Sequence, residues 1–423
     1  MSWIRRRPLA ALGALALSLR VICAVVTEIN PLFPAYYYTD ATLTHGYALS
    51  ALEDVRAGRA PVINGTLGEC IQTLISFEIY RMLGPRPLAP KLFNAFLSAL
   101  AVVVFSWTLS LAFPTQAALT AGLILAVWPS HIFYTSQNLK EAPVCLLAYA
   151  AIGATLAAGF AASASHRRTA SLALLAAVWF LGAGFYRPYV LVCLGAALLA
   201  ALALAATRPP RTNALLTAAV LLCALALYPS AARGMLASFR SGTLSGPDQG
   251  RLIPVEYSAD SPTITRPTSP EGISRFRNAR QSADRQWAAT HAGREISTQI
   301  YPDETFKTWL DVLLYLPKGA LTVLFMPLPG FYPLDGKVGR WAAAGENTAL
   351  FLVALFAATG FARGGNSPAR LGLLAFFAAM TVSAALLEFD LGSAGRHKLL
   401  YLPMLFPFAA EEALRLFLGK ETA

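Results

Sequence analysis

The chain has 423 residues, of which 56% are hydrophobic and only 13% are charged, and its mean hydropathy is +0.52. Soluble domains carry about 25% charged residues, so this composition indicates a polytopic membrane protein and excludes a large soluble core. The formal net charge of +11 would suggest nucleic-acid binding in a soluble protein, but arginines that flank apolar segments explain much of it, and no nucleic acid is expected as a partner. The five cysteines show neither a disulfide framework nor a zinc-binding spacing.

The first predicted element is an apolar run from Pro8 to about Val26, preceded by Arg5-Arg6-Arg7. A basic start and a hydrophobic centre are also typical of a signal peptide. This run is longer than an ordinary signal-peptide core, and the exit Thr27–Pro31 offers no small-x-small cleavage site. We therefore expect an uncleaved membrane helix with its N-terminus in the cytoplasm.

The next region, residues 28–88, is polar and is expected on the outer side of the membrane. Its apolar residues repeat at the spacing of an amphipathic helix that lies at an interface: Leu43, Tyr47, Ala48, Ala51, Leu52 and Val55. A second outer helix is predicted from Glu69 to Leu83. Asp40, at the end of Tyr36-Tyr37-Tyr38-Thr39-Asp40, has two interpretations: a helix N-cap, or a base for a lipid-linked reaction just outside the membrane.

Nine further apolar runs are predicted to cross the hydrocarbon layer, which requires roughly 20 residues. Some are a little shorter than this, which thin or tilted packing accommodates. They lie near 89–112, 115–131, 142–163, 169–185, 188–206, 213–230, 346–362, 370–388 and 398–417. The segment 309–329 is also apolar, but Asp311, Pro317 and Lys318 interrupt it, so a re-entrant or interfacial segment is favoured over a full span. The predicted fold class is an all-α polytopic membrane protein with about ten or eleven transmembrane helices.

Alternation from a cytoplasmic start places arginine and lysine in the inner loops, as the positive-inside rule requires. These loops hold Arg167-Arg168, Arg208 with Arg211, Arg363 with Arg370, and Arg415 with Lys420.

Three parts are expected along the chain: an N-terminal transmembrane module (1–230), an outer-face region (231–306) and a C-terminal transmembrane module (307–423). Residues 240–300 are rich in Ser, Arg, Pro and Gly. They lack the apolar residues for a core of their own, which predicts loops and short helices.

Four cations remain that the topology does not explain, because the positive-inside rule disfavours them in short outer loops. They are Lys140, Arg187, Arg396 and Lys398. Converging cations at a membrane surface suit a phosphate or pyrophosphate group. The alternative is that they reach lipid headgroups or pair with nearby acids, such as Lys140 with Glu141.

A set of short patches, in order along the chain, resembles the GT-C glycosyltransferases, which include protein O-mannosyltransferases and the lipid A aminoarabinose transferase. The patches are Asp40 with the helix that ends at Gly58, Tyr80-Arg81-Met82-Leu83-Gly84, Lys91-Leu92-Phe93-Asn94-Ala95, Trp128-Pro129-Ser130, Ser136-Gln137-Asn138-Leu139-Lys140-Glu141, Arg187-Pro188-Tyr189, and Gly395-Arg396-His397-Lys398 before Leu402-Pro403. The resemblance is continuous over about the first 210 residues.

This resemblance implies a GT-C-like fold and a polyprenyl-phosphate sugar donor at the outer leaflet, with membrane lipids around it and an envelope glycan, lipid or protein as acceptor. Asp40 would act as general base and Glu141 as a second acid. The predicted substrate-binding residues are His45, Glu69, Lys140, Arg187, Tyr189, Arg396, His397 and Lys398. No cofactor is required, although Asp40 and Glu141 could hold a divalent metal ion. The expected location is a bacterial inner (plasma) membrane.

Two other functions stay open from the sequence. A flippase or transporter of lipid-linked saccharides would show inverted repeats, broken helices or charges at mid-membrane. A polysaccharide polymerase or ligase would share the outer loop and outer cations, but would use a pyrophosphate-linked donor.

Overall fold

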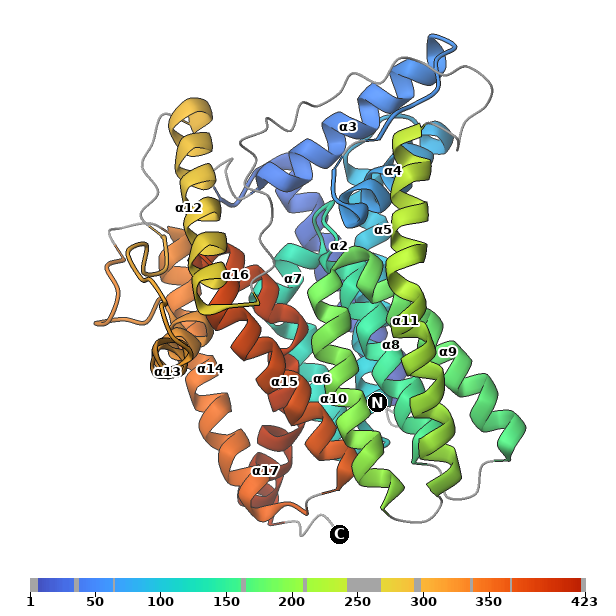
Figure 1. Ribbon diagram of the computed structural model, residues 1–423, viewed down its shortest axis with the longest axis vertical. Helices are drawn as coiled ribbons and strands as arrows, with labels where there is room; N and C mark the ends of the chain where they lie inside the picture. The colour runs from blue at the N-terminus through green and yellow to red at the C-terminus, as the bar shows by residue number, and fades with distance from the viewer. Residues whose placement is uncertain are drawn as a thin grey trace. The chain divides into compact units, whose positions relative to one another are not determined.

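The computed structural model describes residues 7–33, 38–63, 65–160, 165–207, 211–241, 268–292, 298–334, 338–365 and 367–419. Tyr36, Tyr37, Arg208 and Lys420, on which expectations were placed, lie outside these ranges. The described residues are helical, with one isolated β-bridge between Gln299 and Asp390 and no strand. The all-α prediction is confirmed (Figure 1).

The chain divides into two compact units. The first contains residues up to 253 with 353–376 and 402–423, and the second contains 254–352 with 377–401. The first unit holds α2 (Pro8–Ile29), α3 (Thr39–Arg56), α4 (Leu67–Leu83), α5 (Leu88–Leu109), α6 (Thr115–Val127), α7 (Pro129–Thr135), α8 (Glu141–Gly159), α9 (His166–Tyr186), α10 (Pro188–Ala206), α11 (Arg211–Ser241), η3 (Leu402–Leu405) and α17 (Phe406–Leu418). The second holds α12 (Pro270–Ala292), α13 (Trp309–Phe325), α16 (Leu391–His397) and η2 (Lys398–Leu400), while α14 (Val338–Arg363) and α15 (Pro368–Leu387) contribute residues to both.

Eight helices in the described part of the chain are long and apolar enough to cross a membrane, or nine if the bent pair α6–α7 is one span. These are α2, α5, α8, α9, α10, α11, α14 and α15. Two segments account for the difference from the ten or eleven expected. The α13 helix has 17 residues, and the run 398–417 is divided among η2, η3 and the 13-residue α17. Whether α13 is re-entrant stays a prediction.

The break between α6 and α7 is held by a buried arginine. The two helices meet at an angle of 62° next to Pro129, where proline cannot continue the hydrogen-bond ladder. Arg20 of α2 is fully buried and donates to the carbonyls of Ala126 (3.1 Å) and Leu125 (3.5 Å) at the end of α6. It also contacts His131 Nδ1 at 2.8 Å on α7. Arg20 therefore donates to carbonyls at the end of α6, where the helical hydrogen-bond ladder stops, and shares the Leu125 carbonyl with the Trp128 N–H at 3.4 Å.

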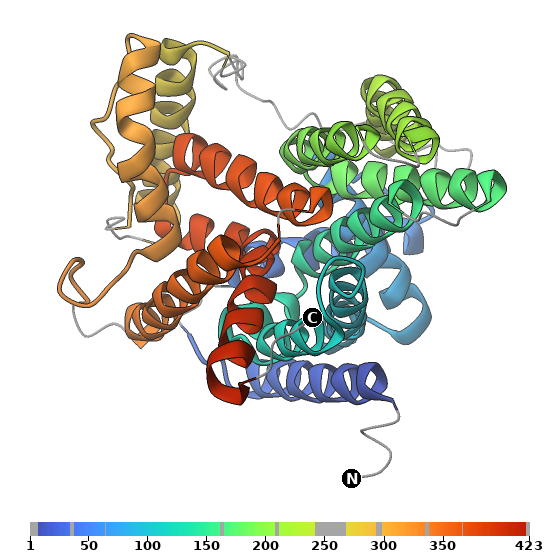
Figure 2. The same ribbon diagram turned by 90° about the horizontal axis from the view of Figure 1, so that it is seen from below.

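Helices α8 to α11 are neighbours in the first unit, and Figure 2 shows them in one group. The α11 helix runs well beyond the predicted end near 230, and its last part packs on the outer helix α4. Phe239 and Met235 of this extension contact the cluster that includes Ile63 and Cys70. Helix α4 therefore packs on the end of α11 as well as on α3.

The two helices predicted between residues 28 and 88 form as α3 and α4, and their position on the outer side stays a prediction. Ala48, Leu52 and Tyr80 belong to the core between them, while Leu43 and Tyr47 of α3 stay exposed. Figure 1 shows α3 running obliquely to the long helices. Gly58, at φ 71°, follows the end of α3 in a left-handed conformation that glycine adopts without strain.

The region predicted to consist of loops and short helices, residues 231–306, contains a long helix in the second unit. Part of it, residues 242–267, lies outside the described ranges, but the rest contains the 23-residue helix α12 rather than short helices. Its buried residue Ile273 packs with Phe306 and Tyr315. Arg277, also buried, donates to the carbonyls of Ile300 and Ala385 at 2.8 and 3.2 Å. The helix thus uses a neighbouring segment as its core.

Candidate active site

The loop between α7 and α8 carries the predicted residue Lys140 and ends at Glu141, the first residue of α8. Its backbone is held from several helices. Asn94 of α5 donates to the carbonyls of Gln137 (2.6 Å) and Leu139 (2.8 Å). Asn138 Oδ1 accepts from Gln72 of α4 at 2.9 Å. These hydrogen bonds satisfy buried polar groups. They also fix the backbone directly before Lys140 and Glu141, and so the positions from which these two side chains extend.

Glu141 and Arg187 form a buried ion pair. Arg187 lies between α9 and α10 and donates from Nη2 to Glu141 Oε1 and from Nη1 to the Tyr189 hydroxyl at 2.6 Å. The side chains of Arg187 and Glu141 are only 6% and 4% exposed. The sequence placed both residues in one site, and the structure brings them into contact, together with Tyr189.

Glu69 and Lys140 form a second, more exposed pair, with Nζ and Oε1 3.4 Å apart. Glu69 also closes a capping box at the start of α4, where its Oε2 accepts from the Thr66 N–H at 2.9 Å. Burial alone raises the pKa of the Glu69 carboxyl, but the Lys140 ammonium and the Thr66 hydrogen bonds outweigh it and lower that pKa. Glu69 therefore stays ionised at neutral pH.

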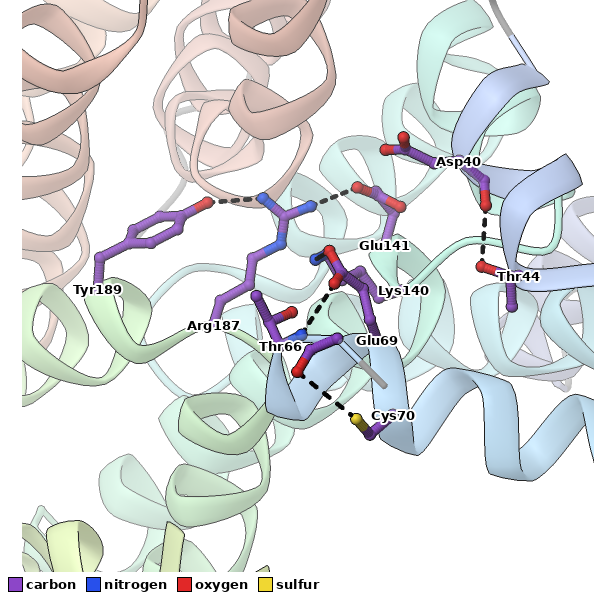
Figure 3. A network of polar contacts seen from close by, with 10 residues as sticks. Asp40, Thr44, Thr66, Glu69, Cys70, Lys140, Glu141, Arg187 and Tyr189 are labelled. Atoms are coloured by element: carbon purple, nitrogen blue, oxygen red, sulfur yellow. Dashed lines mark hydrogen bonds and ion pairs between the residues drawn. The ribbon is translucent and has the colours of Figure 1, made fainter. Parts of the chain in front are cut away.

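A close backbone contact places α4 against the end of α9. A Cβ atom added to Gly68 would come within 2.4 Å of the Tyr186 carbonyl oxygen. Only glycine allows this approach, and it sets Glu69 next to the segment that carries Arg187. Figure 3 shows both ion pairs in one network.

Asp40 lies in the first turn of α3 and is exposed. The N-cap interpretation is wrong, since Tyr38 occupies that position and no side chain caps the helix end. The Asp40 backbone carbonyl accepts from Thr44 Oγ1 at 2.8 Å. In Figure 3 its carboxylate is drawn on the side where the Glu141–Arg187 pair lies. A first-turn carboxylate also interacts favourably with the helix dipole.

His45 lies elsewhere on α3, at a cavity of about 350 Å³. Its Nδ1 is 2.8 Å from the Tyr80 hydroxyl of α4. Burial lowers the pKa of the His45 imidazole, which Glu28 partly opposes, and burial with Glu28 raises the pKa of Tyr80 to about 12. Both groups are therefore uncharged at neutral pH.

Arg396, His397 and Lys398 belong to the second unit. His397 Nδ1 is paired with Glu388. Lys398 is buried and donates to Asn347 Oδ1 and to the Leu324 carbonyl, the latter at 3.2 Å. Arg396 occupies the last turn of α16 beside them. Their predicted contact with a donor phosphate stays a prediction.

Several residues of this end of the first unit did not emerge from the sequence. Glu28 and Lys91 form an ion pair at 2.7 Å at the cavity wall. Both residues lie in segments quoted in the sequence analysis. Neither was selected as a site residue, because Glu28 directly follows one apolar run and Lys91 begins another, where charged residues are common. Arg20 did carry a signal: it is a lone arginine in the middle of an apolar run, where a charge is costly unless it is paired.

Within the described residues there is no group of three or more His, Cys, Asp or Glu side chains placed to hold a metal ion. Carboxylates are suitable ligands for Mg²⁺ or Ca²⁺. Asp40 and Glu141 would therefore supply two protein ligands at most from this set, and a divalent ion stays a prediction.

Comparison with known proteins supports the fold. No protein-family model matches the chain, and no curated protein does. The archaeal oligosaccharyltransferase AglB from Archaeoglobus fulgidus, solved in complex with an inhibitory peptide and a dolichol-phosphate, matches with a TM-score of 0.53 at 15% identity. The match covers 99% of this chain and 52% of that chain.

A second solved structure, ArnT from Cupriavidus metallidurans bound to undecaprenyl phosphate, matches with a TM-score of 0.47 at 14% identity, over 92% of this chain and 60% of that chain. The chain thus spans about half the length of the oligosaccharyltransferase that it matches. The expected resemblance to GT-C membrane enzymes is confirmed at the level of the fold.

Proposed function

We propose that this protein is a membrane glycosyltransferase that moves a sugar from a polyprenyl-phosphate-linked donor to an envelope glycan, lipid or protein at the outer face of a bacterial inner membrane. The proposal rests on the gathering of five charged side chains, which Figure 3 draws close together: Asp40, Glu69, Lys140, Glu141 and Arg187. The shared fold supports it. Both solved neighbours named above were determined with a polyprenyl-type phosphate.

In the proposed reaction the acceptor hydroxyl oxygen attacks C1 of the donor sugar, and its proton passes to Asp40. The bond from C1 to the phosphate oxygen breaks, and its electron pair leaves with the polyprenyl phosphate. A carboxylate must face the acceptor and a cation must face the leaving group. Asp40 and Glu69 are both exposed carboxylates of this set. The lowered pKa of Glu69 makes it a weaker base than an ordinary carboxylate, which favours Asp40 as the base.

Lys140 and Arg187 have different parts in this proposal. The Lys140 side chain is 21% exposed against 6% for Arg187, which favours Lys140 for the leaving phosphate. Arg187 is bound to Glu141 and Tyr189, so it can orient Glu141 as the second acid. The phosphate contact predicted for Arg187 stays a prediction.

The test is Asp40→Asn, with transfer measured in membranes from a labelled polyprenyl-phosphate sugar. Loss of a general base costs roughly 10²–10⁴-fold in turnover. Glu53→Gln is the matched control, because Glu53 is an exposed acid on the same helix. Undiminished turnover of Asp40→Asn at normal expression would refute the base assignment. Turnover only with a pyrophosphate-linked donor would favour the polymerase or ligase.

A second candidate is a flippase, favoured by the mid-span charge of Arg20 and by the broken pair α6–α7. Both features have a structural explanation, since Arg20 binds the carbonyls that the break releases. Reconstitution in vesicles distinguishes the two functions. Movement of lipid-linked saccharide without a new glycosidic bond would favour the flippase.

A further inference from the structure

The cavity at His45 lies on a different face of α3 from Asp40. Tyr38, Thr42 and His45 line it, and their spacing of four and then three residues puts them on one helix face. Asp40 is two residues from Tyr38 and from Thr42, so it leaves the helix in another direction. The volume of about 350 Å³ is near the lower end of the roughly 300–1,000 Å³ of small-molecule sites.

The charges on the described wall of this cavity balance. Lys91 is paired with Glu28 at 2.7 Å, and the lowered pKa of His45 leaves its imidazole neutral. An anionic ligand would meet a cation that Glu28 already holds at 2.7 Å, in a closer and less exposed pair than the 3.4 Å pair of Lys140 with Glu69. The wall therefore suits an uncharged ligand, because a buried charge needs its own partner.

Two amide side chains at the wall have unused hydrogen-bonding capacity. Gln137 donates from Nε2 to Thr27 Oγ1 at 3.1 Å, and Asn138 Oδ1 accepts from Gln72 at 2.9 Å, so the orientation of both amides is set. Among the described residues, Gln137 Oε1 and Asn138 Nδ2 have no partner although both side chains are buried. These two atoms lie behind the surface of the cavity, and they make its wall polar at this point.

Aromatic rings complete the wall. Tyr38 and Tyr80 both line the cavity, and each combines an apolar ring with a hydroxyl. A sugar ring has matching surfaces: C–H groups on its faces, and hydroxyls at its edge that both donate and accept. A purely apolar ligand would take the Thr42 hydroxyl at the wall out of water without offering it a hydrogen-bond partner.

We propose that the cavity lined by Tyr38, Thr42, His45, Tyr80, Gln137 and Asn138 binds one uncharged sugar ring. The source of this sugar, donor or acceptor, rests on the proposed glycosyl transfer, but the binding itself does not. The cavity is a subsite separate from the ion pairs at Lys140 and Arg187.

The binding test uses the full-length protein in detergent and a panel of methyl hexopyranosides, followed by saturation-transfer NMR. Thr42→Trp fills the cavity with an indole from an exposed helix position. Ser50→Trp is the control, since Ser50 is exposed on the same helix and does not line the cavity. We expect at least one glycoside to bind the wild type and the control, and to bind Thr42→Trp about tenfold more weakly or worse. Absence of binding to the wild type, or equal binding to all three proteins, would overturn the proposal.

Turnover assays then identify the source of the sugar. If the cavity holds the acceptor sugar, Thr42→Trp loses transfer but keeps slow hydrolysis of the labelled donor by water. If it holds the donor sugar, transfer and hydrolysis fall together. Loss of transfer in Asp40→Asn with intact glycoside binding separates this subsite from the catalytic proposal.

Discussion

The buried pair between Glu141 and Arg187 allows a quantitative test. Arg187→Met removes the cation and leaves the Glu141 carboxylate, whose side chain is 4% exposed, without that partner. Breaking a buried ion pair by removing one member typically costs about 3–5 kcal/mol. Tyr189→Phe removes the hydroxyl that accepts from the guanidinium, a hydrogen bond to a charged group worth about 1.5–3 kcal/mol.

The double variant Glu141→Gln/Arg187→Met provides the decisive comparison. It leaves no uncompensated charge, so its destabilisation should be smaller than the sum of the two single variants, and the difference is their coupling energy. The assay is thermal unfolding of purified protein in detergent. With roughly 2–4 °C per kcal/mol for a domain of 150–250 residues, and less for longer chains, Arg187→Met should lower the Tm by several degrees.

Two outcomes would refute this reasoning. One is an Arg187→Met variant that is no less stable than Tyr189→Phe. The other is a double variant whose loss of stability equals the sum of the losses in the two single variants. The coupling energy would then be zero, and Arg187 would not stabilise the charge of Glu141.

Three further predictions concern the supports of the site. Arg20→Met removes the side-chain donor to the Ala126 carbonyl and one of two donors to the Leu125 carbonyl, which also accepts from the Trp128 N–H. An acceptor left unsatisfied costs about 1–3 kcal/mol, and thermal unfolding beside the exposed control Ser18→Ala measures the loss. Gly68→Ala should lower both Tm and transfer because the Tyr186 carbonyl occupies the space of the new Cβ, whereas Gly46→Ala on α3, with open space around it, should be neutral or slightly stabilising; equal effects would contradict the close approach. The lowered pKa of Glu69 means that its contribution to stability is complete above the ordinary glutamate pKa of about 4.3 and disappears as the pH falls through the folded-state value. The Tm difference between wild type and Glu69→Gln should therefore be constant from pH 7 to about pH 5 and shrink below pH 4; a difference independent of pH would contradict it.

The parts of the fold that the sequence predicts are those set by local pattern. The helical spacing of Leu43, Ala48 and Leu52 gives α3, and the apolar runs give the membrane helices. Local pattern did not predict that the run 115–131 breaks at Pro129. The break needs a donor for the freed carbonyls, and that donor, Arg20, lies more than a hundred residues earlier.

The sequence predicted which charged residues lie at the candidate site, but it did not predict which of them form ion pairs with one another. Lys140, Glu141 and Arg187 share one side because each follows or precedes a predicted span. The partner of Lys140, Glu69, comes from α4, and the contact between Gly68 and Tyr186 places α4 against the end of α9. The long helix α12 was missed for a related reason: its apolar residues are few, and Ile273 packs on a core that another segment supplies.

One loop connects the two parts of the proposed site. Gln137 and Asn138 reach the cavity, and Lys140 and Glu141, two to four residues further on, supply the charges. Asn94 donates to two backbone carbonyls of this loop, those of Gln137 and Leu139. These hydrogen bonds restrict the movement of the cavity residues relative to Lys140 and Glu141. A sugar in the cavity and a phosphate at Lys140 would then keep a fixed separation, and fixed reacting groups are a large source of rate enhancement. Asn94→Ala should therefore reduce the turnover number more than glycoside affinity. An equal loss of both would mean that the loop supports the cavity alone.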